Sequence, residues 1–262
     1  MLFCNIDLLD EKFETKRNQY VGVKDGRIAY IGASEPEEDF GERYDGRHRL
    51  LMPAFYNVHS HAPMTLLRGY AENLPLQRWL GEKVFPFEDQ IDDEAAYYGT
   101  LLAISEMLAS GTASFSDMYF FFGGMVPAIL ESGIKCNLSR GLTVFDDSDY
   151  TDLPAYRDNV RLRGEWNGAN NGRLIGDLCI HGEYTSNPKI VEAVAQHARE
   201  TGARIQIHLS ETQTEHEECK GRHGLTPAAY MEKHGIFDSP TTAAHCVWLE
   251  DEDFDILKRH GV

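Results

Sequence analysis

Several histidines stand at the ends of short apolar runs of the sequence, where imidazole nitrogens could hold a metal ion. His59 and His61 form an H-x-H pair directly after an apolar run that ends at Val58. Because strand side chains alternate, the two imidazoles fall on one side of a predicted strand. Two imidazoles on one face suit the chelation of one divalent metal ion. A pair of loop histidines without a ligand role is the alternative, and the pattern alone leaves both open.

A second run, Ile205–Leu209, carries His208, and a carboxylate follows three residues later at Glu211. His208 is a candidate third nitrogen ligand. Glu211 is a candidate acid/base that shuttles protons at metal-activated water. The plain alternative is a strand-terminal histidine capped by a loop glutamate. His181 and His245 also stand late in apolar runs, and each taken singly is more often a hydrogen-bonded core residue than a ligand.

The coincidence of these positions carries more weight than any single histidine. Five of the 11 histidines end predicted strands. The C-terminal ends of parallel strands are where the active sites of α/β proteins form. We therefore predict one shared site at these strand ends. The other histidines are expected at the surface: His48, His197, His216, His223, His234 and His260.

The elements that must position this site alternate between strand and helix after Met52. Apolar runs predict strands at residues 51–58, 112–118, 135–142, 174–180, 203–209 and 241–248, and helical patterns lie at residues 92–110, 187–202, 226–235 and 250–261. Such alternation implies parallel strands with crossover helices. Composition does not decide between a barrel and an open doubly wound sheet.

The first fifty residues follow a different pattern and predict a small β-rich unit over residues 1–52. Tyr20–Val23 and Arg27–Ile31 flank Asp25-Gly26, a dipeptide typical of a two-residue hairpin turn. Glu35–Arg49 is polar and charged, and we expect a loop there. Residues 53–262 then form the strand–helix part.

The composition excludes several classes of protein. The chain has 262 residues, 42% of them hydrophobic, and a formal charge of −17, which argues against bulk disorder and against a nucleic acid partner. Five dispersed cysteines without a C-x-x-C pair favour reduced thiols in the cytoplasm. No signal-like or membrane-spanning apolar stretch is present in the sequence. We expect a cytoplasmic protein with no membrane partner and a small-molecule substrate.

Several motifs together resemble one known family. Met52 to His61 looks like the first barrel strand of the metal-dependent amidohydrolase superfamily, and further motifs narrow the match: Pro63-Met64, Leu67-Arg68-Gly69, Leu74-Pro75-Leu76, Trp79-Leu80, Gly111-Thr112-Ala113 and Asp117-Met118. They are similar to the branch of methylthioadenosine/S-adenosylhomocysteine deaminases and triazine chlorohydrolases. The resemblance implies a (β/α)8 TIM barrel, here incomplete with about six strands, and a β-sandwich portion at the N-terminus.

The resemblance also implies roles, position by position. His59, His61 and His208 match metal ligands, Glu211 matches the proton-shuttling acid/base, and His245 matches the histidine that orients the attacking hydroxide. On the substrate side, the matching residues are Glu88 for a ribose, His181 for a purine, and Arg140 as a substrate arginine. Glu88 and Arg140 could instead be surface or ion-paired residues. Zinc is the default divalent metal for a nitrogen-rich hydrolytic site, and Fe2+ or Mn2+ fits nearly as well.

The sequence departs from the family pattern at one ligand. The family's last metal ligand is an aspartate at the end of the eighth strand, and no counterpart stands between His245 and Val262. Asp251, Asp253 and Asp255 fall in a helical stretch that we expect to be solvated. We therefore expect a chain that is C-terminally truncated relative to the family.

These observations predict a metal-dependent hydrolytic deaminase of an aminopurine nucleoside that acts through metal-activated hydroxide. Two alternatives stay open. The same site could displace chloride or another amine from a triazine or pyrimidine ring, or the chain could be an inactive, truncated fragment. We also expect a homo-oligomer.

Overall fold

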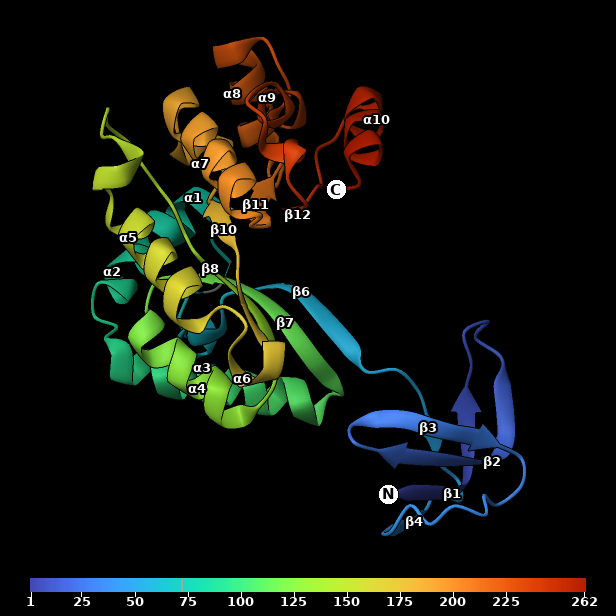
Figure 1. Ribbon diagram of the computed structural model, residues 1–262. Coiled ribbons are helices and arrows are strands. Elements are labelled where there is room, and N and C mark those ends of the chain that lie inside the picture. Colours follow the sequence, from blue (N-terminus) through green and yellow to red (C-terminus); the bar gives the residue numbers. More distant parts are fainter. Residues whose placement is uncertain (72) are drawn as a thin grey trace. The chain divides into compact units, whose positions relative to one another are not determined.

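The computed structural model describes residues 1–71 and 73–262 and divides into two compact units, Met1–Phe55 and Tyr56–Val262 (Figure 1). The first unit is one five-stranded sheet around the central strand β1 (Leu2–Leu9). Its other strands are β2 (Thr15–Lys24), β3 (Arg27–Gly32), β4 (Arg43–Asp45) and β5 (Leu50–Leu51), in the order β3-β2-β1-β4 with β5 also paired to β1. The predicted β-rich N-terminal part is therefore a sheet.

The hairpin predicted around Asp25-Gly26 is confirmed. β2 and β3 pair antiparallel, and both turn residues have positive φ angles of 53° and 72°. Positive φ at both central positions is what a type I′ turn requires. The loop expected over Glu35–Arg49 is wrong in part, because Arg43–Asp45 forms β4, parallel to β1. All three β4 residues are exposed, so no alternation of apolar and polar residues marked the strand.

The second unit carries the predicted alternation of parallel strands and helices. Its strands are β6 (Phe55–Ser60, which begins one residue before the unit), β7 (Thr112–Tyr119), β8 (Lys135–Arg140), β9 (Leu174–Gly176), β10 (Leu178–Ile180), β11 (Ile205–Leu209) and β12 (Thr241–His245). The strand orders are β6-β7-β8-β9 and β10-β11-β12, and β7–β8, β8–β9, β10–β11 and β11–β12 are parallel pairs. Among the described residues these strands do not close into a ring.

The strand predicted over residues 174–180 is interrupted at Asp177, which separates the end of β9 from the start of β10. The Asp177 side chain is buried, and its carboxylate accepts hydrogen bonds of 3.1 Å from Arg204 Nε and from Gln206 Nε2. A buried charge needs such partners, since its desolvation is otherwise costly.

In the described part of the second unit, ten α-helices connect and cover these strands. They are α1 (Leu76–Trp79), α2 (Phe85–Glu88), α3 (Asp93–Ala109), α4 (Phe122–Ser132), α5 (Pro154–Arg161), α6 (Ala169–Gly172), α7 (Pro188–Thr201), α8 (Gln213–His223), α9 (Pro227–Lys233) and α10 (Asp251–His260). The four helices predicted from the sequence correspond to α3, α7, α9 and α10. In the part of the chain that the structure describes, none of the helices combines the length and the apolar character of a membrane span.

Two apolar cores hold the strands in place. One core is formed by residues of α3, α4, β7 and β8, and the other by residues of α7, α9, α10, β10 and β11. Asn187 shows how local sequence fixes the position of α7. Its side chain accepts a 3.0 Å hydrogen bond from the amide of Ile190, the arrangement of a helix N-cap.

The solvated environment expected for the acidic residues of α10 is wrong for Asp253. Its side chain is fully buried and accepts hydrogen bonds from the amide of Glu250 and from the hydroxyl of Thr226. Asp253 thereby completes a capping box at the start of α10 and ties that helix to the start of α9. Asp251 and Asp255 are exposed as expected.

Candidate metal centre and its cavity

The ends of β6, β11 and β12 bring the predicted histidines together around the ring of His208. The centre of that ring lies 4.8 Å from the ring centre of His59, 5.3 Å from that of His61 and 5.2 Å from that of His245. His181 follows β10, and its ring centre is 4.6 Å from that of His208. The parallel order β10-β11-β12 thus places side chains that are far apart in sequence at one edge of the sheet.

Ring nitrogens of three of these residues could hold a metal ion together. One nitrogen each from His59, His208 and His245 lies within 4.8 Å of the others. His61 is held differently, because its Nδ1 lies 2.7 Å from the carbonyl oxygen of Met118. A carbonyl can only accept, so this nitrogen carries the proton and leaves the lone pair of Nε2 for a ligand.

The electrostatic environment favours the neutral form of four of these imidazoles, those of His59, His61, His181 and His208. Burial, with the neighbouring histidines, lowers the pKa of His59 to about 3 and that of His181 to about 4. Burial also lowers the pKa of His61 and of His208. The Nδ1 atom of His208 is buried and has no hydrogen-bond partner among the described residues. Neutral imidazoles and an unpartnered ring nitrogen are the donor set that a divalent metal ion requires, so the residues fit such an ion.

Asp117, at the end of β7, supports the H-x-H pair, and the sequence reasoning assigned it no such role. One oxygen of its fully buried carboxylate accepts from the hydroxyl of Ser60 at 2.8 Å and from the amide of Ala62 at 2.7 Å. Burial raises its pKa to about 7. One sequence signal could have indicated this role of Asp117. It is an aspartate late in the apolar run that follows the H-x-H run along the chain.

Replacing Asp117 is expected to weaken metal binding. Asp117→Ala removes the acceptor for the Ser60 hydroxyl and the Ala62 amide, on the two sides of His61. The loss of such a supporting residue typically costs 10–100-fold in metal affinity. Asp117→Asn keeps an oxygen that can accept both hydrogen bonds and should lose less. Competition with a chelator gives the affinity, and circular dichroism checks the fold. Wild-type affinity in Asp117→Ala would show that this contact does not support the site.

The proposed acid/base stands beside the histidines at the end of β11. The Glu211 carboxylate is 3.8 Å from Nε2 of His245, and both side chains line a cavity of about 380 Å³. The cavity is also lined by His181 and by Glu88 at the end of α2. These predicted substrate residues therefore share one space with the predicted metal ligands.

Arg140 lies apart from this group. Its guanidinium forms an ion pair with Asp158 at 3.0 Å, donates to the carbonyl of Gly141 at 2.7 Å and stacks over the ring of Phe120 at 4.5 Å. Gly141 and Phe120 line the cavity, whereas Arg140 is not among the lining residues. Its role in substrate binding stays a prediction.

The rest of the cavity wall is largely apolar. Five apolar residues of one consecutive stretch face it: Leu76, Trp79, Leu80, Val84 and Phe85. Tyr119 also lines the cavity, and its buried hydroxyl lies near the Glu88 carboxyl without hydrogen-bond geometry to any described residue. Burial raises the pKa of Glu88, and the neighbouring hydroxyl opposes that rise. An apolar cavity with a few convergent polar groups is typical of a small-molecule site.

The surface position expected for the other histidines is confirmed for His48 and wrong for His216. The His216 side chain is buried, and its Nε2 lies 3.0 Å from a carboxylate oxygen of Glu250. A histidine among charged residues of a helix gives no sign of burial when its partner stands 34 residues away.

The sequence matches the Amidohydrolase family over residues 50–262. A 5-methylthioadenosine/S-adenosylhomocysteine deaminase of Dictyoglomus turgidum is 36% identical over 262 residues, which cover all of this chain and 61% of that protein. The curated relatives are matched over 54% to 62% of their own length.

Solved structures show the same fold. An adenosine deaminase from Xanthomonas campestris with bound zinc superposes with a TM-score of 0.83 at 24% identity, over all of this chain and 61% of that one. An atrazine chlorohydrolase from Arthrobacter aurescens, also with zinc, gives a TM-score of 0.88 at 19% identity and is covered to 64%. The (β/α) barrel architecture predicted from the sequence, here unclosed, is thereby confirmed. Together with the family match, these findings show that the chain belongs to the amidohydrolase family.

Proposed function

We propose that this amidohydrolase deaminates an aminopurine nucleoside of the methylthioadenosine, S-adenosylhomocysteine or adenosine type. The observation that carries the proposal is the position of Glu211, beside His245 and on the same cavity as the cluster of neutral histidines. A carboxylate next to an imidazole can move protons at an oxygen nucleophile and at a ring nitrogen. The names of relatives at 36% and 40% identity agree with this chemistry.

His59, His61 and His208 would hold the metal ion, as the family resemblance implies, with His245 at the same edge. The ring nitrogens that lie within 4.8 Å of one another are those of His59, His208 and His245. A bound divalent ion would supply a Lewis acid that makes water a nucleophile near neutral pH. We propose zinc because the donor set is rich in nitrogen. The acidic composition favours a small substrate over nucleic acid. The cytoplasmic location and the homo-oligomer stay predictions.

The chain's own residues would then carry the proton transfers. In the overall reaction, water adds its oxygen to the ring carbon that bears the amino group, the carbon–nitrogen bond breaks, and ammonia leaves. Glu211 would take one proton from the attacking water and deliver it to the purine ring nitrogen. The second water proton would go to the departing amino group, so that ammonia leaves and a ring carbonyl remains. His245, 3.8 Å from that carboxylate, would keep the water oxygen in line. Glu88 and His181 would hold the nucleoside in the cavity.

A ring chlorohydrolase is the second candidate, favoured by the TM-score of 0.88 to the atrazine enzyme. The Glu88 carboxylate in the cavity favours the nucleoside, because a carboxylate accepts hydrogen bonds from the paired hydroxyls of a ribose, which a chlorotriazine lacks. The two reactions differ in their leaving group.

The test is a substrate panel with the 262-residue chain loaded in turn with Zn2+, Fe2+ and Mn2+. Ammonia release from 5′-methylthioadenosine, S-adenosylhomocysteine or adenosine is the expected result. Chloride release from a chlorotriazine without deamination would instead support the second candidate. Stoichiometric metal binding without turnover on any substrate would contradict both and support the inactive fragment.

A further inference from the structure

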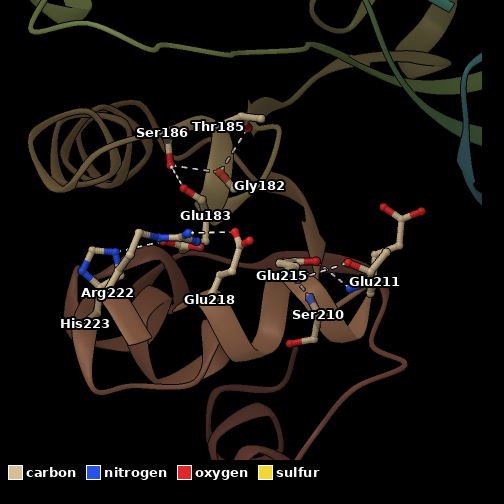
Figure 2. A network of polar contacts seen from close by, with 11 residues as sticks. Gly182, Glu183, Thr185, Ser186, Ser210, Glu211, Glu215, Glu218, Arg222 and His223 are labelled. Atoms are coloured by element: carbon tan, nitrogen blue, oxygen red, sulfur yellow. Dashed lines mark hydrogen bonds and ion pairs between the residues drawn. The ribbon is translucent and has the colours of Figure 1, made fainter. Parts of the chain in front are cut away.

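Glu215, in the first turn of α8, binds the turn that joins His208 to Glu211 (Figure 2). Its side chain is buried. Oε1 accepts from the amide of Ser210 at 3.0 Å, and Oε2 accepts from the amide of Glu211 at 2.7 Å. Each carboxylate oxygen thus holds one backbone amide, while the Glu211 side chain points away from Glu215.

The turn held in this way has an unfavourable backbone conformation. Ser210 is fully buried and has a φ of 50°, in the left-handed region that non-glycine residues seldom occupy. Its carbonyl accepts from the amides of Val247 and Trp248, at 3.0 and 2.9 Å, just after β12. A residue keeps such a conformation only where surrounding contacts enforce it, and residues of this kind cluster at functional sites. Here they come from Glu215 on one side and from the end of β12 on the other.

An ordinary helix cap does not account for these contacts. Thr212 is the N-cap of α8, and its hydroxyl accepts from the amide of Glu215 at 3.1 Å. In a capping box, the glutamate at this position would bind the amide of the N-cap residue itself. The two hydrogen bonds of Glu215 go instead to Ser210 and Glu211, the residues that precede the cap. Its carboxylate therefore acts on the turn that carries Glu211.

The other end of α8 is anchored in the same manner. Arg222 and His223 bind the buried carboxylate of Glu183 at 2.6 and 2.9 Å (Figure 2). Glu183 begins the short turn that follows His181. The helix consequently connects the turn that carries Glu211 with the turn that carries His181, and neither Glu183 nor Glu215 lines the cavity.

We propose that Glu215 is a positioning residue, which fixes the Glu211 backbone so that the Glu211 carboxylate stays beside His245. The inference rests on the proposed function. It assigns Glu215 no contact with substrate or metal. Its effect on turnover comes from orientation alone, and a displacement of about 1 Å in a catalytic group can cost roughly 10²-fold in rate.

Glu215→Gln tests this directly. Glutamine offers one oxygen acceptor where glutamate offers two, so one of the two amides loses its partner. We expect kcat to fall by about 10–100-fold, with KM and metal content unchanged. Hydrogen–deuterium exchange of the segment 205–212 should become faster. Glu215→Asp keeps the charge and shortens the reach, so it should also lower kcat if position, and not charge, is what matters.

Two matched controls separate positioning from stability. Asn187→Ala removes the N-cap of α7, away from the cavity, and should lower the melting temperature without changing kcat. Glu217→Gln makes the same chemical change as Glu215→Gln on the exposed face of α8 and should change neither. If kcat in Glu215→Gln falls no more than in Asn187→Ala, the positioning role is wrong.

The exchange measurement keeps this proposal distinct from the proposed function. A wild-type chain without deaminase activity would contradict the proposed function, and the exchange of segment 205–212 would then decide the positioning role by itself. Unchanged exchange in both Glu215→Gln and Glu215→Asp would overturn it. Faster exchange in both variants, with the controls unchanged, would support it.

Discussion

Glu211→Gln is expected to abolish deamination while the protein keeps its metal ion. The substitution preserves the shape of the side chain but removes the group that would take and release protons beside His245. A positioned acid/base contributes typically 10²–10⁴-fold, so we expect kcat to fall at least into this range. Ammonia release measures turnover, and elemental analysis measures the metal content of the same samples.

Glu217→Gln is the control for Glu211→Gln, because it makes the same change at an exposed position of the neighbouring helix α8. Its turnover and metal content should equal those of the wild type. More than a tenth of the wild-type kcat in Glu211→Gln would rule out the proton-transfer role. Loss of the metal in that variant would mean that Glu211 acts on the metal site instead.

His208→Ala is expected to remove both the metal and the activity. The ring of His208 lies within 5.3 Å of the ring centres of His59, His61 and His245. Its removal eliminates a donor and opens space at the centre of the cluster. The loss should exceed the 10–100-fold decrease in metal affinity that accompanies the loss of a merely supporting residue. Competition with a chelator measures the affinity.

A second variant and an exposed histidine make this result specific. His208→Gln keeps most of the side-chain volume. It therefore controls for a disturbance of the fold by the smaller alanine. His48→Ala removes an exposed histidine of the first unit and should keep full metal content. Metal affinity near the wild-type value in both His208 variants would place the binding site elsewhere.

The sequence predicted the strand ends well because one physical rule connects them. Apolar runs that end in histidine predicted parallel strands here, and the carboxyl ends of parallel strands meet at one edge. His59, His208 and His245 were therefore expected together, and the structure brings their nitrogens within 4.8 Å. The roles of the individual histidines came from the family resemblance and stay predictions.

What the sequence could not predict depends on partners distant in the chain. Asp253 stands among other acidic residues and resembles a solvated position, but Thr226, 27 residues earlier, supplies the hydroxyl that allows its burial. For Arg140 the sequence left an ion pair open beside a substrate role, but it could not name the partners, Asp158 and the ring of Phe120. A polar side chain buried through tertiary contacts leaves no periodic signal, because only the folded chain provides those contacts.

The low pKa values of the clustered imidazoles have a consequence for metal uptake. An imidazole that is still protonated must give up a proton before it can bind a metal ion. Burial keeps the pKa values of His59, His61 and His208 below their ordinary range, so these rings are already neutral at pH 7. Uptake by these three side chains releases almost no protons to the buffer. Their contribution to the apparent affinity is therefore nearly independent of pH around neutrality.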